Sequence, residues 1–251
     1  IVGPEAMKPL AGKSNPDLPP TILGEPTRHW WTYRSDGLVM AIVDQLSERY
    51  PIDRNRIVLS GMSMGGWGTW NLGMRFPDRF SAIIPFAGGL SMRDYGTESL
   101  DDEYSHLIDN LKWLPSYSVH GDQDNIVPTR FSQLLAKELK ERKYDHFYDE
   151  ITGASHYLDF DENGPMMKRV IKWLTPRKRI LHPPEVIHAI ISEDNPRQHW
   201  LRIDARSDDS KPAKIHGKLA RGNRIDIESE NVDAITVFID DKLLRERSSI
   251  T

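Results

Sequence analysis

The chain has 251 residues, of which 38% are hydrophobic and 28% are charged, and its formal net charge is −4 at pH 7. It contains no cysteine, which excludes disulfide bonds, thiolate catalysis and cysteine-ligated metal centres. The small net charge does not indicate a nucleic-acid partner, and no apolar run approaches the ~20 residues of a membrane-spanning helix. We therefore expect a soluble globular protein without nucleic-acid or membrane partners. Its compartment stays open, secreted and periplasmic locations included, and so does its oligomeric state.

Strands and helices are predicted to alternate along the first two thirds of the chain. After a loop rich in proline and glycine, hydrophobic spacing predicts helices at 35–50, 67–75, 131–143 and 166–174, and strands at 57–60, 81–87, 117–120 and 146–151. Residues 91–112 are an acidic insertion with a weak helical pattern. This alternation predicts an α/β sandwich with a largely parallel sheet over residues 1–176.

The pattern changes after Pro176, where basic residues and a Pro-Pro pair predict a linker at 177–183. Short strands are then predicted at 186–192, 200–205, 214–219, 224–229 and 234–240, and Gly222-Asn223 predicts a hairpin turn between two of them. Residues 184–251 are therefore predicted to form a small all-β module.

The motif with the most specific chemistry is Gly61-Met62-Ser63-Met64-Gly65-Gly66, which matches the nucleophile elbow G-x-S-x-G. In such an elbow a strand enters a strained turn that lifts the serine hydroxyl above the sheet, and a helix leaves. The glycines let that helix pack close to the strand. A predicted strand before Ser63 and a predicted helix after it supply this context, so we interpret Ser63 as a nucleophile and not as part of an unreactive turn.

A serine hydroxyl needs a general base, and the base needs an acid that orients it. In this arrangement the acid follows the serine along the chain and the histidine comes last. Asp122 and Asp124 both follow the strand at 117–120. We favour Asp124 as the acid because it lies further into the loop, and we expect Asp122 to shape the turn and cap the next helix.

His156 is the predicted base. It follows the strand at 146–151, so it should lie at the same edge of the sheet as Ser63 and Asp124. The other eight histidines precede the acid or have positions better explained by structure; His120, for example, is expected to be buried at a strand end.

The backbone N–H of Met64 should supply one donor of an oxyanion hole. The second donor normally follows an early strand, and no such strand is predicted before residue 57. We expect that donor and the first strands of the sheet upstream of Ile1; the alternative is a chain with impaired catalysis.

These three motifs resemble those of α/β-hydrolases, over about residues 30–175. The surrounding sequence is similar to polyhydroxybutyrate-depolymerase-like and feruloyl-esterase-like hydrolases and to catalytic domains of the prolyl oligopeptidase type. The resemblance rests on the segments 50–57, 61–66, 76–80, 120–128 and 153–156. It implies Ser63 as nucleophile, Asp124 as acid and His156 as base.

Two further patterns concern metal and substrate binding. The segment from Asp159 to Gly164 opens like a calcium loop, but Val170 stands where a bidentate glutamate is needed, so we expect no metal and no other cofactor. We expect Trp30, Trp31 and Trp67 to contribute to substrate binding, and at least one of Trp67 and Trp70 to be buried.

The sequence thus predicts a serine hydrolase that cleaves carboxylic esters, on small molecules or polymers, through an acyl-enzyme. One alternative is a prolyl-oligopeptidase-like serine peptidase. The other is a non-catalytic polysaccharide-binding protein on a hydrolase fold.

Overall fold

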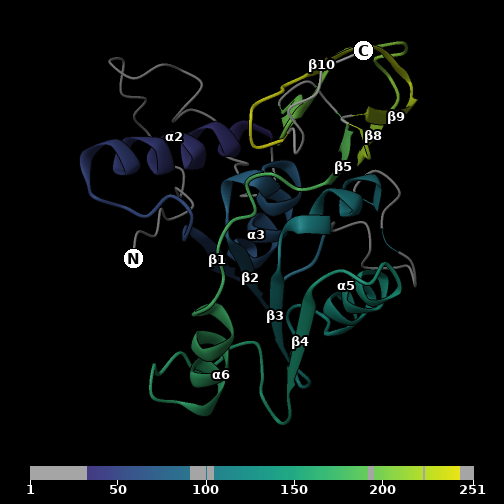
Figure 1. Cartoon of the computed structure of the whole chain (residues 1–251). Helices are drawn as coiled ribbons and strands as arrows, with labels where there is room; N and C mark the ends of the chain where they lie inside the picture. The colour runs from purple at the N-terminus through teal and green to yellow at the C-terminus, as the bar shows by residue number, and fades with distance from the viewer. Residues whose placement is uncertain (1–32, 91–99, 101–104, 192–194, 223, 244–251) are drawn as a thin grey trace, which may run out of the picture.

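The computed structural model describes residues 33–90, 100, 105–191, 195–222 and 224–243 (Figure 1). The first part of the chain is a layered α/β region, and antiparallel strands follow it at the top of the view in Figure 1. The strands of the α/β region are β1 (Val58–Met62), β2 (Ala82–Phe86), β3 (Ser116–Gly121) and β4 (His146–Ile151). Its helices are α2 (Tyr33–Arg49), α3 (Met64–Arg75), α5 (Arg130–Glu141) and α6 (Pro165–Leu174), with the 3₁₀ helices η1 (Pro77–Arg79) and η3 (His106–Trp113).

The four strands form one parallel sheet in the order β1-β2-β3-β4, which confirms the predicted α/β class. Successive residues of a strand point to opposite faces of the sheet, so the two faces have separate cores. Ile83 of β2 packs in one cluster with Leu135 of α5, and its neighbour Ile84 packs in another with Val170 of α6. Because all four strands run the same way, their carboxyl ends share one edge of the sheet.

Several predicted elements differ from the observed ones in their bounds, and β10, for example, covers Val232–Val237 where a strand was expected at 234–240. The helix expected from Trp67 begins three residues earlier, at Met64, because the turn at Ser63 leads directly into α3. In the acidic insertion, residues 106–113 form η3 and not an α-helix. The rest of that insertion lies outside the described residues, apart from Leu100 and Ser105.

The C-terminal region contains two three-stranded antiparallel sheets, with strand orders β5-β8-β9 and β10-β7-β6. They share a hydrophobic core that includes Val186, Leu201 and Ile215. The predicted hairpin is confirmed, since β8 pairs with β9 up to the turn at Gly222, whose φ is +74°. The strands are β5 (Glu185–Ile190), β6 (Arg197–Gln198), β7 (Leu201–Arg206), β8 (Ala213–Ala220), β9 (Arg224–Glu230) and β10 (Val232–Val237).

The two regions are joined by buried hydrogen bonds around Asn110 of η3. Its side-chain amide donates to the carbonyl oxygens of Met74 and Ala189, each at 2.9 Å, and its side-chain oxygen accepts the Ala189 N–H at 2.7 Å. Gln198 of β6 donates to the Asn110 carbonyl at 3.1 Å. Ala189 also packs in the core that contains Leu107 of η3, so this core crosses from one region into the other.

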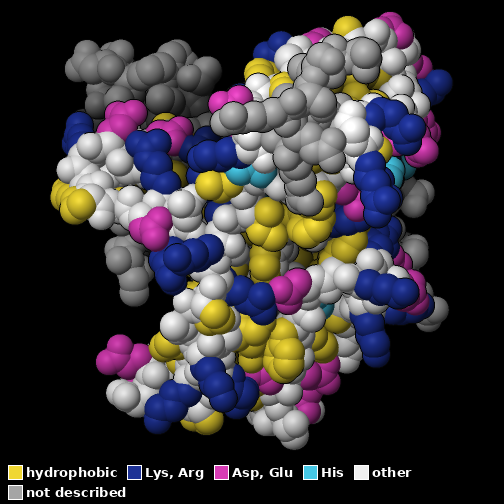
Figure 2. Space-filling view, in the orientation of Figure 1, with side chains coloured by type: hydrophobic (Ala, Val, Ile, Leu, Met, Phe, Trp, Pro, Cys, Tyr) yellow, Lys and Arg dark blue, Asp and Glu magenta, His cyan; other side chains and the backbone are white. Residues whose placement is uncertain are grey.

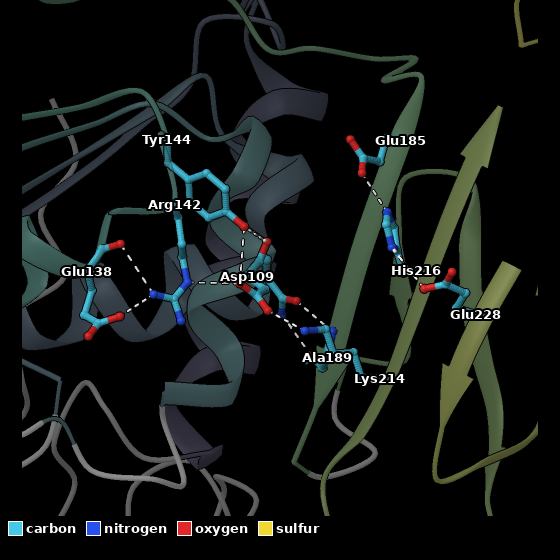
Figure 3. Close-up of polar contacts among 10 residues, drawn as sticks. Asp109, Glu138, Arg142, Tyr144, Glu185, Ala189, Lys214, His216 and Glu228 are labelled. Carbon is cyan, nitrogen blue, oxygen red and sulfur yellow. Dashed lines mark hydrogen bonds and ion pairs between the residues drawn. The ribbon is translucent and has the colours of Figure 1, made fainter. Parts of the chain in front are cut away.

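Charged contacts surround this junction (Figure 3). The Asp109 carboxylate accepts hydrogen bonds from Arg142, after α5, and from Lys214 of β8, and Tyr144 donates to it at 3.3 Å. The expected linker is also attached to the α/β region, because Arg179 donates to the carbonyl oxygens of Asn55 and Asp78. The C-terminal strands are therefore bound to the α/β region at several points along the chain.

Figure 2 shows Lys and Arg side chains interspersed with Asp and Glu over the visible face, with hydrophobic side chains gathered near its middle. The visible face has no extended field of one sign, in keeping with the small net charge. No helix in the described part of the chain has both the length and the apolar character needed to cross a bilayer.

Candidate active site

Ser63 occupies the turn between β1 and α3 with a strained backbone. Its φ of 56° and ψ of −116° lie in a region that residues with a side chain rarely adopt. The turn is held because the Ser63 N–H donates to the Phe86 carbonyl at 2.8 Å and the Ser63 carbonyl accepts the Trp67 N–H at 3.0 Å. Gly66 permits the close approach of α3 to β2, since a Cβ there would collide with the Phe86 carbonyl oxygen. The local geometry is the one that the elbow motif predicts.

The structure brings the three predicted triad residues together at the carboxyl-end edge of the sheet. Ser63 Oγ lies 2.9 Å from His156 Nε2, although the two residues are 93 positions apart. His156 Nδ1 lies 2.7 Å from Asp124 Oδ2. The side chain of Asp124 is fully buried and that of His156 is 6% exposed. A continuous hydrogen-bonded path therefore runs from the serine hydroxyl to a buried carboxylate.

Hydrogen bonds keep the Asp124 carboxylate ionised. Burial raises its pKa, but the hydrogen bond from His156 and the backbone N–H groups of Val127 and Ile126 outweigh burial and hold the pKa below its ordinary value. Those two N–H groups donate to Oδ1 at 2.8 and 2.9 Å. An anion at this point holds the hydrogen of His156 on Nδ1, which leaves Nε2 able to accept the serine proton.

Asp122 connects the loop of the acid with the loop of the histidine. Its Oδ1 accepts the Gly153 N–H at 2.7 Å, so it does shape this turn. The expected helix cap is wrong: the N-cap residue of α5 is Thr129, and no side chain caps the helix there. The same two loops approach closely at Gly121, where a Cβ would lie 2.5 Å from the Ser155 carbonyl oxygen.

Met64 is the first residue of α3, so its N–H has no acceptor within the helix. Its position beside Ser63, at the positive end of the helix, suits a donor to an oxyanion. The second donor, expected upstream of Ile1, lies outside the described residues.

Of the three tryptophans predicted to contribute to substrate binding, the structure describes Trp67. Trp30 and Trp31 lie outside the described residues. Trp67 is only 2% exposed and packs edge-on against Phe131, with ring centroids 5.4 Å apart. Trp67 also packs in one cluster with Val127, which belongs to the loop of the acid. The expectation that Trp67 or Trp70 is buried is confirmed, because both are.

His120 makes a contact at the site that the sequence does not predict. It is buried at the end of β3, as expected, but its Nε2 also lies 3.1 Å from Asp124 Oδ2. The available signal was a histidine on a buried strand four residues before the predicted acid.

Within the described residues, no group of three or more histidine and carboxylate side chains is arranged to hold a metal ion.

An elbow serine followed by an acid and a histidine from later strand ends defines an α/β-hydrolase fold. A family model described as phospholipase/carboxylesterase matches residues 30–175, more than half of the chain. The chain therefore belongs to this phospholipase/carboxylesterase family of α/β-hydrolases, which confirms the class predicted from its motifs.

Individual relatives are more distant. A bifunctional acetylxylan esterase/xylanase, XynS20E of Neocallimastix patriciarum, is 28% identical over 89 residues, which are 36% of this chain and 11% of that protein. A thermostable esterase of known structure is 28% identical with a TM-score of 0.47, over 61% of this chain and 42% of the other. SOBER1 of Arabidopsis thaliana is 20% identical with a TM-score of 0.46, over 61% and 67% of the two chains. The chain thus spans about a tenth of the curated relative it matches and less than half of the thermostable esterase.

Proposed function

We propose that this protein hydrolyses carboxylic esters through an acyl-enzyme, with Ser63 as nucleophile, His156 as general base and Asp124 as orienting acid. The observation that carries the proposal is the 2.9 Å approach of Ser63 Oγ to an imidazole whose other nitrogen is 2.7 Å from a buried carboxylate. Membership of the phospholipase/carboxylesterase family favours ester hydrolysis over peptide cleavage.

In the proposed acylation step, His156 Nε2 takes the Ser63 proton as Oγ attacks the ester carbonyl carbon. The Met64 N–H donates to the oxyanion of the tetrahedral intermediate. His156 then gives the proton to the leaving alcohol as its bond to the acyl carbon breaks. A water molecule attacks the acyl-enzyme in the same way, and the acid and free Ser63 are released.

Covalent labelling tests the nucleophile. A fluorophosphonate probe should label the protein, and Ser63→Ala should abolish the labelling. Ser60→Ala is the matched control, because that hydroxyl lies on β1 and donates to the Ile84 carbonyl. Labelling that persists in Ser63→Ala would refute the assignment.

Turnover assays test the reaction class. We expect hydrolysis of esters from a panel of p-nitrophenyl, feruloyl and acetyl-sugar esters, and slower or no hydrolysis of peptide amides. The acetyl-sugar substrate is included because the curated relative is named an acetylxylan esterase/xylanase. Faster cleavage of amides would favour the peptidase alternative. Labelling without turnover of any substrate would favour an impaired or non-catalytic chain.

A further inference from the structure

His120 contacts the same carboxylate oxygen of Asp124 that His156 contacts. It is fully buried at the end of β3, and its ring lies between the loop of the acid and α5. Nε2 is 3.1 Å from Asp124 Oδ2 and 2.9 Å from the Val127 carbonyl oxygen. Neither of these oxygens can donate a hydrogen bond, so Nε2 must carry the hydrogen.

The other ring nitrogen fixes the orientation of His120. Nδ1 lies 2.7 Å from Ser132 Oγ on α5. Burial lowers the pKa of His120 despite the opposing effect of Asp124, so the ring is neutral and Nδ1 is an acceptor. The Ser132 hydroxyl therefore donates to Nδ1, and the imidazole is held at both nitrogens.

Asp124 consequently has a donor for every position that its carboxylate offers. Oδ1 accepts two backbone N–H groups. Oδ2 accepts from His156 and from the Nε2–H of His120, a single hydrogen that His120 shares with the Val127 carbonyl oxygen. The titratable groups facing His120 are Asp124 and, beyond it, His156. Without His120, Oδ2 would be held only by His156, the side chain whose charge changes in each proposed proton transfer.

We propose that His120 is a positioning residue for the triad acid. It pins Asp124 Oδ2 through a donor that does not change charge during the cycle, and it withdraws part of the negative charge that His156 meets. Ser132 holds His120 in the orientation that allows this. The effect of His120 on turnover rests on the proposed function. The orientation of Asp124 by His120 rests on the hydrogen-bond geometry alone.

A pair of amide variants separates the two nitrogens of His120. The amide of His120→Gln reaches about as far as Nε2 and can still donate to Asp124, whereas His120→Asn reaches only as far as Nδ1. With p-nitrophenyl acetate, kcat of His120→Asn should fall roughly 10- to 100-fold while KM changes less than about twofold, and His120→Gln should recover most of the loss. The acid limb of kcat/KM should move to higher pH in His120→Asn, because Asp124 with one donor fewer holds more negative charge beside the imidazolium.

The matched control is His188→Gln, which changes another buried histidine far along the chain, on β5. It should lower stability and leave the acid limb in place. If His120→Asn fails to fold, Ser132→Ala provides the test, with a loss in kcat of roughly threefold to tenfold and the same direction of pH shift. The proposal would be overturned if folded His120→Asn had the kcat of the parent protein and an unchanged acid limb. If His120→Asn does not fold, the same result in Ser132→Ala would overturn it.

A measurement without turnover separates this proposal from the proposed function. The Nδ1 proton of His156 should give a downfield ¹H NMR resonance, identified by its loss in His156→Gln. This resonance should shift or broaden in His120→Asn and stay near its original position in His120→Gln. A protein without esterase activity that shows this pattern would refute the function and retain the positioning role, whereas an unchanged resonance in His120→Asn would refute the positioning role.

Discussion

The α/β region and the C-terminal region each bury a histidine, but in very different surroundings. His120 of β3 contacts the Asp124 carboxylate and a hydroxyl from α5. Nδ1 of His188 in β5 lies 3.0 Å from the side-chain oxygen of Gln198. The side-chain nitrogen of Gln198 donates to the backbone of η3. The first histidine contacts the candidate triad acid, and the second lies at the junction between the regions. Burial alone therefore does not distinguish a histidine at a reactive site from a structural one; the groups it contacts do.

The same contrast extends to the other polar groups. At the strand ends of the α/β region they converge on Ser63, where the backbone is strained and a proton can move. At the junction, Asn110 and Gln198 hydrogen-bond to backbone groups of the two regions. Substitutions of the polar groups near Ser63 should thus lower kcat. Substitutions of Asn110 or Gln198 at the junction should lower the free energy of unfolding.

The largest effect should come from Asp124→Asn. The amide can donate to His156 Nδ1 and so selects the wrong tautomer, and kcat should fall roughly 10⁴-fold. Steady-state kinetics on a p-nitrophenyl ester check this. Asp122→Asn is the matched control and should lose less than about tenfold, because that carboxylate holds the Gly153 N–H and does not touch His156. If kcat fell further in Asp122→Asn than in Asp124→Asn, Asp122 would be the acid.

Asn110→Ala should separate stability from activity. It leaves two buried carbonyl groups and the Ala189 N–H without their side-chain partners, so the free energy of unfolding should fall by about 3 kcal/mol. Urea titration measures the loss, and kcat per folded molecule should stay within about twofold of the parent. Asn163→Ala, at an exposed position, should change stability by less than about 0.5 kcal/mol. A comparable loss of kcat in Asn110→Ala would show that the junction also shapes the site.

A pH titration of stability compares buried histidines of the two regions. Burial lowers the pKa of His146 in β4 and of His188 in β5 to about 4 each. The unfolded chain takes up protons at these positions near pH 6.5, before the folded chain does. Their stabilising contribution is therefore present above pH 6.5 and is lost as the pH falls toward 4. Each should remove about 2 kcal/mol between pH 7 and pH 5.

Single variants assign the loss to each of these two histidines. His188→Gln should reduce the dependence of stability on pH by the contribution of His188, and His146→Gln by the contribution of His146. Urea unfolding at pH 7 and pH 5 gives both values. A slope that is the same in the parent and in both variants would contradict the assignment.

Asp109→Asn should have the smallest effect. Burial raises the pKa of Asp109, but Lys214 and Arg142 outweigh it and hold the pKa below the ordinary value. A lowered pKa means that the contribution is present above about pH 4 and is lost as the pH falls through the folded value. These side chains are partly exposed, so the variant should lose about 1 kcal/mol at pH 7. The difference between parent and variant should shrink as the pH falls below 4, and a constant difference would point to a purely steric effect.

The alternation of strands and helices, the elbow at Ser63 and the loops of Asp124 and His156 could be predicted because each is encoded within about ten consecutive residues. Hydrophobic spacing predicts a strand or helix, and parallel strands bring their carboxyl ends to one edge of a sheet. β6 was missed because a strand of two residues has no alternation to detect. The partners that bury Trp67, by contrast, are Phe131 and Val127 from a distant segment, which local spacing does not reveal.

The linear order of residues by itself determined the class of fold, the α/β-hydrolase superfamily and the three side chains, those of Ser63, Asp124 and His156, that meet at one edge of the sheet. Only the tertiary structure decided that Asn110 pairs with Ala189, 79 positions away, and that the C-terminal strands share a core with the α/β region. It also decided that His120 faces the oxygen of Asp124 that receives His156. The physical reason is that local patterns specify elements and their exposed or buried faces, whereas the partner of a buried polar atom depends on its position in three dimensions to within a few tenths of an ångström.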